Sequence, residues 1–192
     1  MKGAFLLKIF IDQGHNPQNP NAGAEGFGLK EQDINFKIGI LLAELLSANP
    51  DYQVKLSRPT AQTQLGTSNS TSLAARVNAA NEWGADYFIS LHTNASEISS
   101  ASGSEAFAYA RNSQAFTLGE NILYWLNQIT GLQNRGMKIR PSLYVLKKTR
   151  MPAVLVELGF ISNYYDATLM NTQPELFAQG VYYGILDYME LL

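Results

Sequence analysis

Three short apolar runs dominate the pattern of hydrophobic and polar positions along the chain. They cover residues 8–11, 87–91 and 153–156, and polar residues follow each of them. Apolar runs of this length, bounded by turn signals, are typical of strands that are buried on both faces of a parallel sheet. The end of each run is followed by a potential base or metal ligand, namely His15, His92 and Glu157.

Longer segments between and after these runs have helical periodicity. Apolar side chains recur at helical spacing in residues 29–47. A second helix is expected to begin with Ser72 as its N-cap residue and to run to Trp83, with Gly84 ending it. The remaining predicted helices are residues 113–130, closed by Gly131, and a last helix opened by Pro174.

Weaker signals complete the expected order of elements. Additional strands are predicted at residues 52–57, 105–110 and 142–146. Segments rich in Gly, Pro, Ser and Asn predict loops at residues 16–28, 58–71 and 96–103. Strands that alternate with helices predict the α/β class, with a mostly parallel sheet covered by helices on both faces. Because the connection from residue 145 to residue 154 is too short for a helical crossover, we expect a mixed sheet.

Composition narrows the classes of function. The chain has 192 residues, a length that fits one domain, with 46% hydrophobic and 16% charged residues. A net charge of −2 provides no basic field, which argues against nucleic-acid binding. The absence of cysteine excludes disulfides and thiolate metal sites. We find no apolar run long enough to span a membrane and no visible export signal, so no membrane partner is expected.

The two histidines indicate a zinc site. Catalytic zinc is bound by three protein ligands from histidine and carboxylate, which leaves one position for water. His15 and His92 supply two ligands, and the third is expected to be Glu31, with Glu25 as the alternative. Glu157 is then placed to accept a proton from water.

Each of these residues also has a structural interpretation. Glu31 fits the first turn of a helix, where the helix dipole favours an acid. A carboxylate at Glu157 is costly to bury unpaired, so Arg58 or Arg135 is an expected partner. Asp12 is expected either to cap a helix or to orient His15. The residues alone favour a zinc hydrolase and leave a plain structural α/β domain as an alternative.

Four ordered motifs resemble those of the zinc-dependent N-acetylmuramoyl-L-alanine amidases of type 3, which cleave peptidoglycan. The motifs are residues 9–15 (IFIDQGH), 28–35 (GLKEQDIN), 90–95 (SLHTNA) and 152–163 (PAVLVELGFISN). Residues 135–136 and 143–146 are similar to the stretch that precedes the last motif in that family. The resemblance covers essentially the whole chain. It implies a three-layer α/β/α, phosphorylase/hydrolase-like fold and one catalytic domain, residues 1–192.

The resemblance also implies specific roles. His15, Glu31 and His92 would bind one zinc ion per chain, and this favours Glu31 over Glu25. Hydrolysis would cut the amide between the lactyl group of N-acetylmuramic acid and L-alanine, with Glu157 taking the proton of water and returning it to the leaving amine. Further candidates for supporting a ligand or binding substrate are Asp12, Asn94 and Arg135. The implied setting is the bacterial cell wall, with peptidoglycan as the partner and a monomer as the working form.

Two positions depart from the family pattern. Gln13 stands where proline is usual and Asn16 where glycine is usual, so the first loop is expected to have its own shape. Residues 96–103 are too few for the inhibitory helical insert of regulated members, so an open groove is expected. Rival functions are a zinc peptidase of related fold that acts on free peptides and a wall-binding module without turnover. The sequence does not distinguish a phage lysin, an autolysin and a sporulation enzyme, although the lack of a visible export signal favours a lysin.

Overall fold

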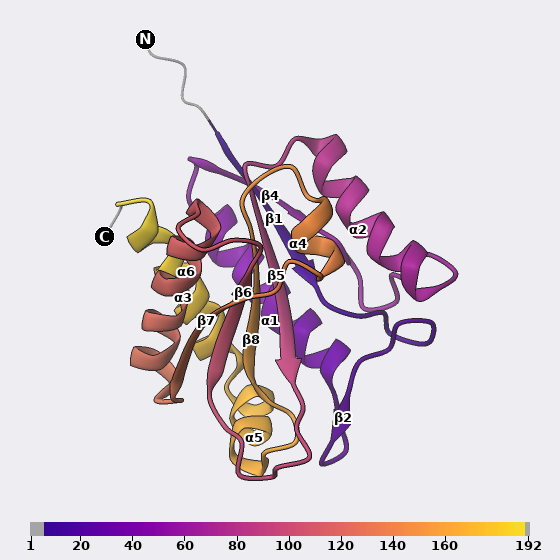
Figure 1. Ribbon diagram of the computed structural model, residues 1–192, viewed down its shortest axis with the longest axis vertical. Coiled ribbons are helices and arrows are strands. Elements are labelled where there is room, and N and C mark those ends of the chain that lie inside the picture. The colour runs from indigo at the N-terminus through magenta and orange to yellow at the C-terminus, as the bar shows by residue number, and fades with distance from the viewer. Residues whose placement is uncertain (1–5, 191–192) are drawn as a thin grey trace.

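A six-stranded sheet lies between two layers of helices in the computed structural model, which describes residues 6–190 (Figure 1). The strands of this sheet are β1 (Leu7–Gln13), β4 (Tyr52–Leu56), β5 (Tyr87–Asn94), β6 (Ser104–Ala108), β7 (Asn134–Ile139) and β8 (Ala153–Phe160). Their order across the sheet is β4–β1–β5–β8–β6–β7. A separate hairpin pairs two short strands, β2 (Glu25–Gly26) and β3 (Leu29–Lys30).

Helices cover both faces of the sheet, as the sequence predicts. They are α1 (Glu31–Ser47), α2 (Asn69–Trp83), α3 (Gln114–Thr130), α4 (Tyr144–Lys148), α5 (Tyr164–Thr172) and α6 (Pro174–Tyr188). The side chains of α1, α3 and α6 form one hydrophobic core with one face of the sheet, and α2 and α4 pack on the other face. The three-layer α/β/α architecture is therefore confirmed.

The apolar runs are strands buried on both faces. In β1, Ile9 and Ile11 contribute to the core under α1 and α6, whereas Phe10 between them packs under α2. In β8, Val156 belongs to the core under α1 and α6, and Leu155 belongs to the core under α2. Because successive residues of a strand point to opposite faces, a strand covered on both sides needs an apolar residue at every position.

The sheet is mixed, but not for the expected reason. Strands β1, β4, β5 and β8 are parallel, whereas β6 is antiparallel to β8 and β7 is parallel to β6. The carboxyl ends of β1, β5 and β8 therefore lie at the same edge of the sheet as the amino ends of β6 and β7. This edge holds the residues that the sequence singled out.

The predicted strand at residues 142–146 is wrong, because Tyr144–Lys148 forms helix α4. Val145 and Leu146 are adjacent in the sequence and are both buried against the same face of the sheet, which a helix allows and a strand does not. The sequence analysis missed β7, whose polar residues lie at the exposed edge of the sheet, and it also missed α5.

The starts of two helices also differ from expectation. Helix α1 begins at Glu31, two residues later than expected. Leu29 and Lys30 instead form strand β3, which pairs with β2 inside the segment expected to be a loop, residues 16–28. Helix α2 begins one turn before Ser72, with Ser68 as its N-cap. The side chains of Ser68 and Thr71 form a capping box, in which threonine takes the position usually held by Glu or Gln. Ser72 is buried and its Oγ accepts a hydrogen bond from Asn21 Nδ2.

Among the residues that the structure describes, no helix has the length and apolar character needed to cross a membrane.

The cap of α2 predicts a measurable loss of stability. Replacing Ser68 with alanine removes the acceptor for the Thr71 backbone N–H, so the Ser68→Ala variant should lose about 1 kcal/mol of unfolding free energy in urea titrations. Ser47→Ala, at the exposed last turn of α1, is the matched control and should change the unfolding free energy by less than about 0.5 kcal/mol. Equal losses in the two variants would contradict the capping role.

Candidate metal centre and active site

Side chains from three separate elements meet at the carboxyl edge of the sheet. His15 follows β1, His92 lies near the end of β5, and Glu31 is the first residue of α1. Glu31 Oε1 lies 3.2 Å from His15 Nε2 and 3.0 Å from His92 Nδ1. One potential ligand atom from each residue lies within 4.8 Å of the other two. Glu25, the alternative carboxylate, is exposed on the β2–β3 hairpin.

This donor set fits a zinc ion. Two imidazoles and one carboxylate are a ligand set of catalytic zinc sites. Ligands at about 2.0–2.2 Å from a tetrahedral zinc lie roughly 3.3–3.6 Å from one another, close to the two separations between Glu31 and the histidines. His15 Nδ1 lies 3.3 Å from the Asn21 carbonyl oxygen, and a hydrogen bond donated there leaves Nε2 with a lone pair for a metal.

Backbone and side-chain donors hold the Glu31 carboxylate ionised. Glu31 Oε2 accepts a hydrogen bond of 2.9 Å from the Ala24 backbone N–H, and Oε1 accepts one of 3.1 Å from the Thr93 backbone N–H. Burial acts to raise the pKa of Glu31, but the hydrogen bonds and charges of His15 and His92 outweigh it and hold this pKa well below its ordinary value. The group is therefore an anion that a cation would bind.

His15 has a strained backbone, with a φ of 68° in the left-handed region that non-glycine residues rarely adopt. The buried Arg76 of α2 stabilises this conformation, because its Nη2 donates a 2.6 Å hydrogen bond to the His15 carbonyl. The φ angle of Gly14 lies outside the left-handed region. Its lack of a side chain is needed for packing, because a Cβ there would lie 2.4 Å from the His92 ring. The role of Gly14 is therefore close packing against His92.

Asp12 acts on His15 through Arg76. Arg76 Nη1 donates 2.6 Å hydrogen bonds to Asp12 Oδ1 and to the Gln13 carbonyl, and Ser90 Oγ donates to Asp12 Oδ2. Burial acts to raise the pKa of Asp12, but the charge of Arg76 outweighs it and holds the pKa below its ordinary value. Asp12 lies within β1 and caps no helix, so of the two roles expected for it only orienting His15 fits the geometry. Arg76 is not among the residues expected from the sequence. Its charge lies next to the apolar Val77, on the side of α2 that is buried, and such a position could have indicated a buried ion pair.

Gln13 and Asn16 both shape the loop that presents His15. The Gln13 amide pairs with the backbone of Arg58, accepting from its N–H and donating to its carbonyl. Asn16 Oδ1 accepts from the Leu65 N–H, and its Nδ2 donates to the Leu65 carbonyl. Both side chains are fully buried, so these departures from the family pattern tie the His15 loop to residues 58–65.

Glu157 lies beside the three donors, and no basic side chain within residues 6–190 pairs with it. In the sheet it is directly opposite His92 on β5 and Glu105 on β6. Its buried Oε2 has no hydrogen-bond partner among the residues that the structure describes. Burial, reinforced by the negative charges of Glu31 and Glu105, raises the pKa of Glu157 to about 8.

Neither arginine expected to neutralise Glu157 does so. Arg58 donates to backbone carbonyls, including that of Gln32 at 2.9 Å, and Arg135 Nε donates to Glu105 Oε2 at 3.0 Å. Asn94 likewise donates to Glu105, at Oε1 and 3.0 Å. The prediction of an ion pair at Glu157 is wrong, and its raised pKa favours the protonated carboxyl in the absence of a counter-ion.

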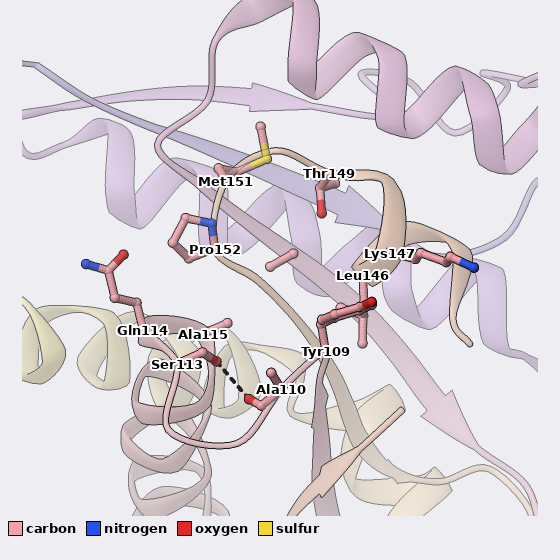
Figure 2. Close-up of a pocket in the computed structure, with 11 residues that line it drawn as sticks. Tyr109, Ala110, Ser113, Gln114, Ala115, Leu146, Lys147, Thr149, Met151 and Pro152 are labelled. Carbon is pink, nitrogen blue, oxygen red and sulfur yellow. Dashed lines mark hydrogen bonds between the residues drawn. The ribbon is translucent and has the colours of Figure 1, made fainter. Parts of the chain in front are cut away.

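A cavity lies away from this site. It has a volume of about 500 Å³ and opens between the end of β6 and the beginning of β8 (Figure 2). Tyr109, Ser113, Lys147 and Pro152 are among the residues that line it. Because β6 and β8 are antiparallel, these segments lie at the edge of the sheet opposite to the histidines. The cavity thus contributes nothing to the candidate centre.

Two curated proteins are similar to this chain. The N-acetylmuramoyl-L-alanine amidase CwlM of Bacillus licheniformis is 34% identical over 181 residues, which cover 93% of this chain and 66% of that protein. The N-acetylmuramoyl-L-alanine amidase LytC of Bacillus subtilis strain 168 is 37% identical over 187 residues, covering 94% of this chain and 35% of that protein. The chain thus spans only part of the length of these relatives.

A solved structure and a family model agree with these likenesses. The CwlD amidase from Clostridioides difficile, solved in complex with the GerS lipoprotein, is 28% identical with a TM-score of 0.88. The match covers 97% of this chain and 100% of that one. Residues 9–187 match the family model described as N-acetylmuramoyl-L-alanine amidase. The chain therefore belongs to the N-acetylmuramoyl-L-alanine amidase family.

Proposed function

We propose that the chain hydrolyses the amide between N-acetylmuramic acid and L-alanine of peptidoglycan with the help of one zinc ion. Membership of the amidase family supports the reaction and the substrate. The observation that carries the zinc proposal is the convergence of His15, Glu31 and His92 within 4.8 Å. Two imidazoles and an ionised carboxylate are a donor set that favours a divalent cation of this kind.

The proposed chemistry divides between the metal centre and Glu157. Zinc bound by the three residues would supply a Lewis acid that polarises the amide carbonyl and lowers the pKa of a water molecule. Glu157 accepts the proton of the attacking water and then donates it to the nitrogen of L-alanine as the C–N bond breaks. A pKa raised to about 8 keeps this carboxyl close to both protonation states near neutral pH.

Residues at a distance from the reacting bond position the ligands. Arg76, held by Asp12, fixes the backbone of His15 by hydrogen bonds to its carbonyl and to that of Gln13. The proposed working form is a monomer, in which one chain supplies every proposed ligand and Glu157. We place its activity at the bacterial cell wall, where the substrate lies.

Replacing Glu157 with glutamine tests the proposed reaction. Purified peptidoglycan treated with the zinc-loaded wild type should yield new L-alanine amino termini, whereas the Glu157→Gln variant should be slower by about 10²- to 10⁴-fold because it accepts no proton. Elemental analysis should find zinc bound in both proteins, since Glu157 is not a proposed ligand.

Two controls complete this experiment. Glu120→Gln on the exposed side of α3 removes the same charge far from the site and should leave the rate unchanged within about twofold. Free peptides serve as a second substrate. Cleavage of free peptides in preference to peptidoglycan would replace the amidase proposal with a peptidase, and full activity of Glu157→Gln would remove Glu157 from the mechanism.

The raised pKa of Glu157 predicts a pH-dependent stability of the metal-free protein. Because the folded pKa of about 8 exceeds the ordinary value of 4.5, the folded state favours the protonated form. The stabilisation from the bound proton is complete below about pH 4.5 and is lost as the pH rises to about 8. Urea unfolding of EDTA-treated protein should therefore show the wild type losing stability relative to Glu157→Gln across this range. A difference that does not change with pH would contradict the burial of this carboxyl.

A further inference from the structure

A cluster of opposite charges lies beside Glu157 on the outer strands of the sheet. The buried Glu105 of β6 accepts hydrogen bonds from Asn94 Nδ2 at 3.0 Å, Arg135 Nε at 3.0 Å and Lys138 Nζ at 2.5 Å. Arg135 and Lys138 both belong to β7, the edge strand. The proposed hydrolysis makes no use of the two cations.

Sheet register places this cluster in line with the site. His92, Glu157 and Glu105 are directly opposite one another on β5, β8 and β6, so their side chains share one face of the sheet. Neighbouring strands are about 4.8 Å apart, which puts β7 roughly 10 Å from the Glu157 backbone. In Figure 1, β6 and β7 follow β8 at one side of the sheet.

The cluster carries an excess positive charge that faces solvent. The cations of Arg135 and Lys138 and the carboxylate of Glu105 give the cluster a net charge of +1. Glu105 stays ionised although it is buried. Burial acts to raise the pKa of Glu105, but hydrogen bonds from Lys138 and Arg135 outweigh it and hold the pKa below the ordinary value. The side chains of Arg135 and Lys138 are 32% and 42% exposed, whereas that of Glu105 is 6% exposed.

Arg135 is held in place with part of its guanidinium unused. Its Nε donates to Glu105, its Nη1 donates to the Ser102 carbonyl at 3.2 Å, and its guanidinium carbon lies 5.0 Å from the centre of the Phe160 ring. Within residues 6–190, Nη2 forms no side-chain hydrogen bond. A guanidinium fixed on one edge and open on the other is suited to binding a carboxylate.

We propose that Arg135 and Lys138, positioned by Glu105, bind a carboxylate of the peptide that leaves with L-alanine. This inference rests on the proposed amidase function. An extended peptide advances about 3.3–3.6 Å per residue, so a distance of roughly 10 Å corresponds to the first three residues of the stem peptide. The free carboxylates in that part of the stem are anions of the right charge and reach. The two cations therefore select for an unamidated stem peptide.

Paired substrates test this selection. A muropeptide with free stem carboxylates is compared with the same molecule in which every stem carboxylate is a carboxamide. The wild type should cleave the free acid with a kcat/KM about tenfold higher, chiefly through a lower KM, because a charge-assisted hydrogen bond is lost in the amide. The double variant Arg135→Gln, Lys138→Gln should lower this preference to below about twofold.

Matched controls separate binding from folding. Lys147→Gln with Lys148→Gln removes two exposed lysines of α4 and should retain the tenfold preference. Should the double variant fail to fold, salt provides a test on the wild type alone, since raising NaCl from about 0.05 M to about 0.5 M should weaken the preference several-fold by screening. Equal cleavage of both substrates by the wild type, or a preference insensitive to both the variant and salt, would overturn the inference. Cleavage of neither substrate would instead overturn the proposed amidase function.

Discussion

The buried ion pair between Arg76 and Asp12 is the interaction on which the geometry of the centre depends. It joins α2 to the end of β1, and both side chains are almost completely buried. Removing two charges from water is costly unless their hydrogen-bonding capacity is used. Here Arg76 also bonds the carbonyls of Gln13 and His15, and Asp12 also accepts from Ser90. The pair thereby holds His15 in a left-handed conformation that it would otherwise leave.

Two carboxylates at this edge are driven to opposite protonation states by their surroundings. Glu31 lies between two histidines and accepts hydrogen bonds from backbone N–H groups, so it stays ionised. Glu157 lies beside other carboxylates, and its buried Oε2 has no partner among the described residues, so Glu157 favours its protonated form. Such a division suits one acid as a ligand and the other as a carrier of protons. Both states arise from where β8 and α1 place the groups, not from the residue type.

The sequence predicts those parts of the fold and site that depend on local pattern. Continuous apolar runs identified β1, β5 and β8, and the residues at their ends, His15, His92 and Glu157, meet because carboxyl ends of parallel strands share one edge. From the sequence, Glu31 is the preferred third ligand because it begins the helix after the His15 loop. The family resemblance then strengthened that preference.

Features that depend on tertiary contacts were missed or mistaken. Strand β7 is polar because it lies at the edge, and α4 resembled a strand because its apolar stretch is short. The role of Arg76 depends on Asp12, more than fifty residues away, and the role of Glu105 depends on side chains of the neighbouring strand β7. The periodicity of a sequence does not reveal such partners. Arg58 and Arg135 have the charge expected of a partner for Glu157, but their positions direct them to backbone carbonyls and to Glu105.

The most direct test of the account is a crystal structure of the zinc-loaded protein with anomalous data collected on both sides of the zinc absorption edge. We expect one strong anomalous peak per chain, at about 2.0–2.2 Å from one atom each of His15, Glu31 and His92. Glu157 should lie beside this peak and outside bonding distance. A peak bound by other residues, or no peak at these three side chains in the presence of saturating zinc, would contradict it.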